Sequence, residues 1–202
     1  SPCVVAGIPR GGVLVAAPVA DRLRAPLAVA YARKVTPYPG SELAIGAVDE
    51  DGEILLDPAT APALHWSPEN LEEARKRALA EILRQREQNP PAWRLLPGRA
   101  VVLVDDGLAT GLTMRAALAY VRRHGAPKVI VAAPCASEEA AARFKREADR
   151  CICPVVDACF GAVGSYYLAF ESVSDEEVLA ALAGARARMP APDDIAPPPD
   201  AL

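Results

Sequence analysis

The sequence predicts an α/β fold, a doubly wound and mostly parallel sheet flanked by helices. Short apolar runs alternate along the chain with longer amphipathic stretches, the pattern of parallel strands joined by crossover helices. Apolar residues are consecutive within the runs, as in strands that are covered on both faces. Two of the runs lead through a turn of glycine and other small residues into a helical stretch, which is the βα unit of such a sheet.

The individual elements follow from these patterns in chain order. Strands are expected at the apolar runs 3–7, 27–31, 101–104, 128–134 and 151–156. Helices are expected at 13–23, 67–89, 114–121, 137–148 and 174–186. Two helix starts are well marked, because Ser67 precedes a proline and Ser174 can form a capping box with Glu177. Residues 43–48 and 54–56 surround a turn at 49–52, which predicts a β-hairpin insertion.

The composition is that of an ordinary globular protein. The 202 residues are 51% hydrophobic and 24% charged, which suffices for a packed core. One domain is expected over residues 1–188, followed by a Pro-rich tail at 189–202 with the composition of a disordered segment. The first residue is Ser1 rather than methionine, which is compatible with a piece of a longer polypeptide.

Charge and cysteine content narrow the class of protein further. A net charge of -4 gives no electrostatic reason to expect nucleic acid or an anionic membrane as a partner, so an anionic substrate has to be bound by local groups. No apolar run has the length of a membrane span. The five cysteines are odd in number and lack zinc-ligand spacing, and no signal peptide is visible. A reducing, cytoplasmic environment is therefore expected.

The most informative stretch follows the strand at 101–104. Asp105 and Asp106 stand at the carboxyl end of that strand, where ligands bind in an open α/β sheet. A short loop of small and hydroxyl residues comes next and feeds a helix, whose free N–H groups and positive dipole end can hold a phosphate. The pattern predicts carboxylates for sugar hydroxyls or a metal beside a phosphate seat. The alternative is a buried strand that ends in a solvated Asp-Asp turn.

These residues resemble the phosphoribosyl-pyrophosphate (PRPP) motif of type I phosphoribosyltransferases, in which an apolar strand, an acidic pair and Thr-Gly-x-Thr stand at fixed offsets. The resemblance implies that Asp105 and Asp106 hold the ribose hydroxyls and, indirectly, a Mg²⁺ ion. It also implies a loop that wraps the 5-phosphate, made of Ala109, Thr110, Gly111, Leu112 and Thr113.

A second turn stands at the same edge of the predicted sheet. The first strand ends at Gly7 and is followed by the tight turn Ile8-Pro9-Arg10-Gly11-Gly12. Exposed backbone N–H groups beside an arginine suit an anion. The pattern is similar to the pyrophosphate loop of type I phosphoribosyltransferases, which implies that Arg10, Gly11 and Gly12 bind pyrophosphate. A plain glycine turn with a surface arginine is the alternative.

Basic residues are expected at the end of the second strand. Arg33 and Lys34 follow it, and either Lys34 or Arg33 can neutralise charge on departing pyrophosphate. A solvated pair is the alternative. The Pro- and Gly-rich residues 35–42 are a candidate lid. An Arg-Lys pair, a Pro-rich turn and a Glu-x-Ala-x-Gly-Ala segment (42–47) together resemble the bacterial "predicted phosphoribosyltransferase" branch.

Residues 157–171 gather aromatic side chains and resemble the hood of purine phosphoribosyltransferases. Stacking of a planar base on Phe160, Tyr166 or Tyr167 is the functional interpretation. A small aromatic cluster that closes the end of the sheet is the structural one. The hood varies between family members, so it does not identify the base.

The resemblance as a whole implies a Mg²⁺-dependent glycosyltransferase that moves ribose 5-phosphate from PRPP to a nitrogenous base. Asp105, Asp106, Lys34 and Arg10 are its predicted catalytic residues. Ala109 departs from many purine enzymes, which carry a proton-handling Asp at that position. A non-catalytic PRPP- or nucleotide-binding regulator therefore stays open. A homodimer is open too, and the amphipathic helix at 67–89 can pack either on the sheet or on a partner subunit. A metal-dependent phosphatase that uses the acidic pair fits the Thr-Gly-x-Thr loop poorly.

Overall fold

The computed structural model describes residues 3–41, 43–58, 60, 66–88 and 98–188. A five-stranded parallel sheet forms its centre, in the order β2-β1-β6-β7-β9. Its strands are β1 (Cys3–Gly7), β2 (Leu27–Val29), β6 (Ala100–Val104), β7 (Val129–Ala132) and β9 (Arg150–Ile152). The helices are α1 (Gly11–Leu23), α2 (Pro68–Gln88), α3 (Leu112–Arg123), α4 (Glu138–Glu147) and α5 (Asp175–Ala187).

Both faces of the central sheet are buried at β1, β2 and β6, which explains the consecutive apolar residues of these strands. In β1, Val4 belongs to the core formed with α3 and α4, whereas the next residue, Val5, belongs to the core formed with α1 and α5. Leu103 and Val104 of β6 divide in the same way. Successive side chains of a strand point to opposite faces, so an unbroken apolar run supplies both cores. The predicted doubly wound, mostly parallel sheet is confirmed.

A second sheet is antiparallel and joins β3 (Ala32–Val35), β4 (Gly46–Asp49) and β5 (Ile54–Leu56) in that order. The predicted hairpin is present as β4 and β5. The prediction that Arg33 and Lys34 follow the end of a central strand was wrong, because the central strand stops at Val29 and both residues lie inside β3. Between the two strands Tyr31 is buried, and its backbone N–H donates to the Glu50 carboxylate at 3.2 Å instead of continuing the central sheet.

Two further predicted strands are divided in the same manner. The runs 128–134 and 151–156 each contribute one strand to the central sheet and lead into a separate parallel pair, β8 (Cys135–Ser137) and β10 (Val155–Asp157). Pro134 and Pro154 stand at the two break points. Proline has no N–H to donate to a ladder, so each run leaves the central sheet there.

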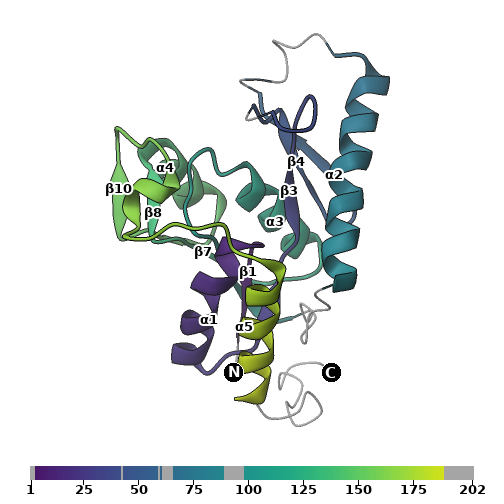
Figure 1. The fold of residues 1–202 in the computed structure, drawn as a ribbon. Coiled ribbons are helices and arrows are strands. Elements are labelled where there is room, and N and C mark those ends of the chain that lie inside the picture. The colour runs from purple at the N-terminus through teal and green to yellow at the C-terminus, as the bar shows by residue number, and fades with distance from the viewer. Residues whose placement is uncertain (1–2, 42, 59, 61–65, 89–97, 189–202) are drawn as a thin grey trace.

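Figure 1 shows how the additions flank the central sheet. The parts α4, β8 and β10 lie on one side of the view, and α2 covers the antiparallel sheet on the other. A short 3₁₀ helix, η2 (Val163–Tyr166), lies in the predicted hood. The predicted helix starts at Ser137 and Ser174 are present, the latter as a full capping box. The tail at 189–202 and Glu42 of the candidate lid fall outside the described residues.

None of the helices in the described part of the chain is long and apolar enough to span a membrane.

An ion pair fastens the antiparallel sheet to α3. The carboxylate of Asp49 is 2% exposed and accepts from Arg123 at 2.8 Å, while Asp51 accepts from the same guanidinium nitrogen at 3.0 Å. Asp49 also accepts from the backbone N–H groups of Asp51 and Glu53. The hydrogen bonds from Arg123 to the two carboxylates raise the pKa of its guanidinium. Leaving a buried carboxylate without its charged partner lowers the stability of the fold. The loss of this ion pair is therefore expected to cost more stability than the loss of an ordinary surface pair.

We expect Arg123→Met to lower the free energy of unfolding by about 1–3 kcal/mol, because it leaves Asp49 buried with backbone partners alone. Urea unfolding followed by circular dichroism measures this. The matched control is Arg122→Met, since Arg122 lies 3.9 Å from a different carboxylate, that of Asp149, and both side chains of that pair are exposed. Equal losses in the two variants would contradict the assignment.

Candidate functional site

The two predicted anion loops emerge side by side because β1 and β6 are neighbours in the sheet. The backbone N–H of Ile8 donates to the carbonyl of Val104 at 2.9 Å, so pairing continues into the loops. A Cβ on Gly11 would overlap the carboxylate of Asp106. A Cβ on Gly12 would lie 2.9 Å from Oδ1 of Asp105. The glycines therefore allow the pyrophosphate loop to touch the acidic pair.

The acidic pair lies in an environment that disfavours two negative charges. Burial raises the pKa of Asp105 well above its usual value, and the neighbouring charge of Asp106 adds to this. Burial also raises the pKa of Asp106. The charge of Lys34 acts in the opposite direction on both pKa values, which places its ammonium within electrostatic range. The pair therefore favours a ligand that brings positive charge or hydroxyl donors.

Residues 157–171 are fastened to the acidic turn. The phenol of Tyr167 donates to the backbone carbonyl of Asp106 at 2.6 Å, and the Cys135 thiol lies 3.8 Å from the same oxygen. A Cβ on Gly107 would lie 2.6 Å from a methyl group of Val163, so η2 packs directly on this glycine. The predicted hood thus contacts the site through the backbone of the acidic turn.

The three aromatic residues predicted to stack on a base have partners within the hood. Phe160 and Tyr166 stack on each other with ring centroids 4.9 Å apart and an interplanar angle of 12°. The Tyr166 phenol donates to Asp157 at 2.6 Å. Tyr167 is tilted against Phe170 at 5.1 Å. This is the arrangement of an aromatic cluster, in which one face of Phe160 is already covered.

The predicted 5-phosphate loop ends at the start of α3. Gly111 has φ +71°, the left-handed region that favours glycine, and Leu112 is the first residue of the helix. The first N–H groups of a helix have no partner within it, so this end of α3 has the donors that an anion requires. Below the loop, Phe144 of α4 lies so close that a Cβ on Gly111 would come within 2.7 Å of its ring.

Two neighbouring pockets divide the predicted site residues between them. The acidic pocket, of about 540 Å³, is lined by Arg10, Gly11, Asp106, Tyr167, Phe170 and Glu171 among others. The loop pocket, of about 1030 Å³, is lined by Ala109, Thr110, Leu112, Ser137, Arg143 and Phe160 among others. No described residue lines both. The acidic pocket thus brings Asp106 to the pyrophosphate loop, and the loop pocket brings the 5-phosphate loop to Phe160.

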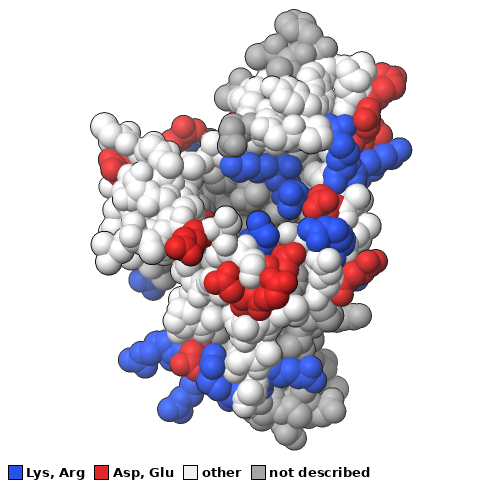
Figure 2. Space-filling model, viewed as in Figure 1, with Lys and Arg blue, Asp and Glu red and all other residues white. Residues whose placement is uncertain are grey.

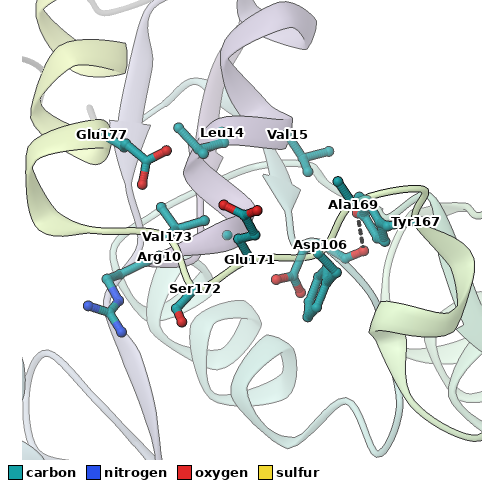
Figure 3. Close-up of a pocket in the computed structure, with 12 residues that line it drawn as sticks. Arg10, Leu14, Val15, Asp106, Tyr167, Ala169, Glu171, Ser172, Val173 and Glu177 are labelled. Atoms are coloured by element: carbon teal, nitrogen blue, oxygen red, sulfur yellow. Dashed lines mark hydrogen bonds between the residues drawn. The ribbon is translucent and has the colours of Figure 1, made fainter.

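Figure 3 shows the acidic pocket in detail. Tyr167 meets the Asp106 backbone, and the carboxylate of Glu171 extends into the same space from the segment that precedes α5. The Arg10 side chain points away from Asp106, so the guanidinium is not paired with the acid. Glu171 is the last residue of the predicted hood at 157–171, but the sequence gave no signal that its carboxylate enters this pocket.

Lys34 lines a third pocket, of about 560 Å³, together with Arg33, Thr36, Pro39 and Arg77. This pocket lies between β3, the candidate lid and α2. Arg77 of α2 donates to the carbonyl of Pro37 at 3.0 Å and so connects the helix to the candidate lid. Figure 2 shows a hollow near the centre of the viewed face with basic side chains gathered beside it and acidic ones below. Positive charge is thus concentrated locally in a chain of net charge -4.

The described residues contain no group of three or more His, Cys, Asp or Glu side chains arranged to hold a metal ion. Asp105 and Asp106 supply two carboxylates at most. The pair therefore fits a cation whose remaining ligands come from a substrate, and it does not form a complete protein site.

The raised pKa values have a consequence for stability. An acid whose pKa is higher in the folded than in the unfolded state makes the protein less stable as pH rises above the unfolded value. We expect Asp105→Asn to raise the melting temperature at pH 7 by about 2–4 °C, the effect of about 1 kcal/mol in a chain of this length. The gain should shrink as the pH falls, because the raised pKa of Asp105 lets the folded wild type take up a proton more readily than the unfolded chain does. The control is Glu87→Gln on the exposed end of α2. A gain independent of pH would contradict the electrostatic cause.

Sequence comparison relates these features to known proteins. Residues 1–171 match the family model of the phosphoribosyl transferase domain. A "putative phosphoribosyl transferase" of Mycobacterium tuberculosis, in strain H37Rv and in strain CDC 1551, is 41% identical over 181 residues. The match takes in 89% of this chain but 41% of each relative, so the chain spans about two fifths of the length of these curated relatives.

Structural comparison agrees with this. The crystal structure of the protein TT1426 from Thermus thermophilus is 43% identical to this chain and superposes with a TM-score of 0.70. The superposition covers 90% of this chain and 87% of that one. The architecture, the family match and this neighbour lead to one conclusion: the chain belongs to the phosphoribosyl transferase family and has its type I fold.

Proposed function

We propose that this protein transfers the 5-phosphoribosyl group of PRPP to a nitrogenous base and releases pyrophosphate. The observation that carries the proposal is the contact between the acidic pair and the Arg10–Gly12 turn at the ends of adjacent parallel strands. Shortly after Asp106 the chain also provides a glycine-containing loop at the N-terminus of α3. Ribose hydroxyls, pyrophosphate and a phosphate monoester each find suitable groups at this edge of the sheet.

Each predicted residue has a role that its chemistry allows. The backbone N–H groups of Gly11 and Gly12 and the guanidinium of Arg10 bind pyrophosphate. Lys34 contributes positive charge as the leaving group departs. Asp105 and Asp106 accept hydrogen bonds from the ribose hydroxyls. A Mg²⁺ ion, held chiefly by substrate oxygens beside these carboxylates, would neutralise pyrophosphate charge when bound.

In the proposed reaction the bond from C1 of the ribose to pyrophosphate breaks, and a bond from C1 to a ring nitrogen of the base forms. Positive charge develops on the sugar and is stabilised by the nearby carboxylates. The proton on the accepting nitrogen cannot go to residue 109, since alanine has no group to take it. We therefore propose an acceptor that is acidic enough to lose this proton to solvent without a base from the loop.

The alternative is a protein that binds PRPP or a nucleotide without turnover. Ala109 favours it, because the loop lacks a proton acceptor at this position. The stacked pair of Phe160 and Tyr166 also favours it, since one face of Phe160 is occupied. Phe160 still lines the loop pocket beside Ala109, so its other face is our candidate platform for a base. A cytoplasmic location and a homodimer stay predictions.

The test is pyrophosphate release from PRPP and Mg²⁺ across a panel of purine and pyrimidine bases. We expect release with at least one base, and a fall in kcat/KM of about 100-fold or more for Asp106→Asn, as when an electrostatic partner of a transition state is removed. Asp21→Asn on the surface of α1 is the matched control and should keep full activity.

Calorimetry distinguishes the two candidate functions. Binding of PRPP without release of pyrophosphate in the presence of any base would favour the regulator. Absence of PRPP binding would overturn both.

A further inference from the structure

Two successive backbone carbonyls of the 5-phosphate loop accept hydrogen bonds from side chains of α4. One of these side chains is at the N-cap of the helix and the other is within it. The Ser137 hydroxyl donates to the carbonyl of Ala109 at 2.7 Å. The guanidinium of Arg143 donates to the carbonyl of Thr110 at 3.0 Å. The bonded residues are 28 and 33 positions apart in the sequence, so both contacts depend on the tertiary fold.

These bonds determine where the amides of the loop point. The peptide bonds after Ala109 and Thr110 are trans, and in a trans peptide the C=O and the N–H that it joins point in opposite directions. When α4 holds the two carbonyls, the N–H groups of Thr110 and Gly111 therefore face away from α4. These are donors that a phosphate needs from a backbone loop.

Both side chains are themselves held in place. Ser137 is the N-cap of α4 and accepts from the N–H of Ala140 at 3.0 Å. Arg143 donates to Glu139 at 2.6 Å, and its own side chain is 23% exposed although that of Glu139 is 82% exposed. An exposed ion pair such as Arg143–Glu139 contributes little stability. The hydrogen bond from Arg143 to the Thr110 carbonyl is therefore the contact that matters for the loop. Buried Phe144, packed below Gly111, anchors the helix against the loop.

We infer that Ser137 and Arg143 are positioning residues which orient the amides of residues 110 and 111 toward a bound phosphate monoester. This rests on the proposed function and assigns α4 a part in it. The two residues act through the loop backbone. The amides of the loop are already oriented before the phosphate binds, so the loop loses less conformational freedom on binding.

The experiment measures two ligands that use different loops. Calorimetry with ribose 5-phosphate reports on the 5-phosphate loop, and pyrophosphate with Mg²⁺ reports on the Arg10–Gly12 turn. Arg143→Met keeps most of the length of the side chain and removes its donors. We expect the Kd of ribose 5-phosphate to rise about tenfold, the effect of one hydrogen bond from a charged group, with the Kd of pyrophosphate unchanged. Arg146→Met, on the same helix, should change neither.

Salt separates positioning from direct attraction by the Arg143 charge. An effect exerted through the Thr110 carbonyl persists at about 0.5 M salt, whereas attraction between exposed charges is screened. In turnover, the KM for PRPP should rise while kcat is kept. Disappearance of the difference at high salt, or an equal loss for both ligands, would overturn the inference.

The outcomes also separate this inference from the proposed function. If the wild-type protein binds neither ribose 5-phosphate nor PRPP, the proposed function fails and the inference fails with it. If the wild type binds and Arg143→Met binds equally well, the inference alone fails. Should Arg143→Met not fold, Arg143→Lys replaces it, because lysine lacks the planar fork that reaches Thr110 and Glu139 together. We then expect weaker binding of ribose 5-phosphate with unchanged binding of pyrophosphate. An unchanged affinity for ribose 5-phosphate overturns the inference.

Discussion

The site depends on how closely two loops approach at the carboxyl ends of β1 and β6. Gly11 and Gly12 place bare backbone against the carboxylates of Asp105 and Asp106, where any side chain would overlap them. The same approach removes water from the acids and raises the pKa of each. Two acidic groups held in this way are poorly satisfied by the protein alone. Hydroxyl groups or a cation would complete their environment, so one packing constraint both shapes the pocket and favours ligands of that kind.

Local patterns in the sequence predict the framework well. Consecutive apolar residues identify strands buried on both faces, and β1 and β6 occur where such runs stand in the sequence. The anion loops follow from the same reasoning, because a turn after a parallel strand must lie at the ligand edge of the sheet. Capping residues predict the starts of α4 and α5 for an equally local reason, since a serine side chain reaches only the next turn.

Long-range contacts were beyond the reach of local patterns. Nothing near Arg143 or Ser137 indicates that α4 lies under a loop much earlier in the chain, and Glu171 reaches the acidic pocket only through the course of the last segment. The assignment of Lys34 to a strand end failed because the apolar run 27–31 does not reveal that β2 stops at Val29, that the Tyr31 N–H bonds to Glu50, or that a new strand begins at Ala32. The aromatic residues of the hood were recognised as a group, but their pairing with each other depends on backbone geometry that composition does not encode.

Pro134 and Pro154 have an effect that reaches beyond their own positions. Each ends a run of the central sheet, and the chain beyond both prolines pairs as β8 and β10. Backbone hydrogen bonds from Ala133 to Ile152 and from Val155 to Pro134 still connect this small annex to the central sheet. The thiol of Cys135 and the hydroxyl of Ser137, both in β8, contact the carbonyls of Asp106 and Ala109. The bend at the prolines therefore brings the annex against the backbone of two turns of the candidate site.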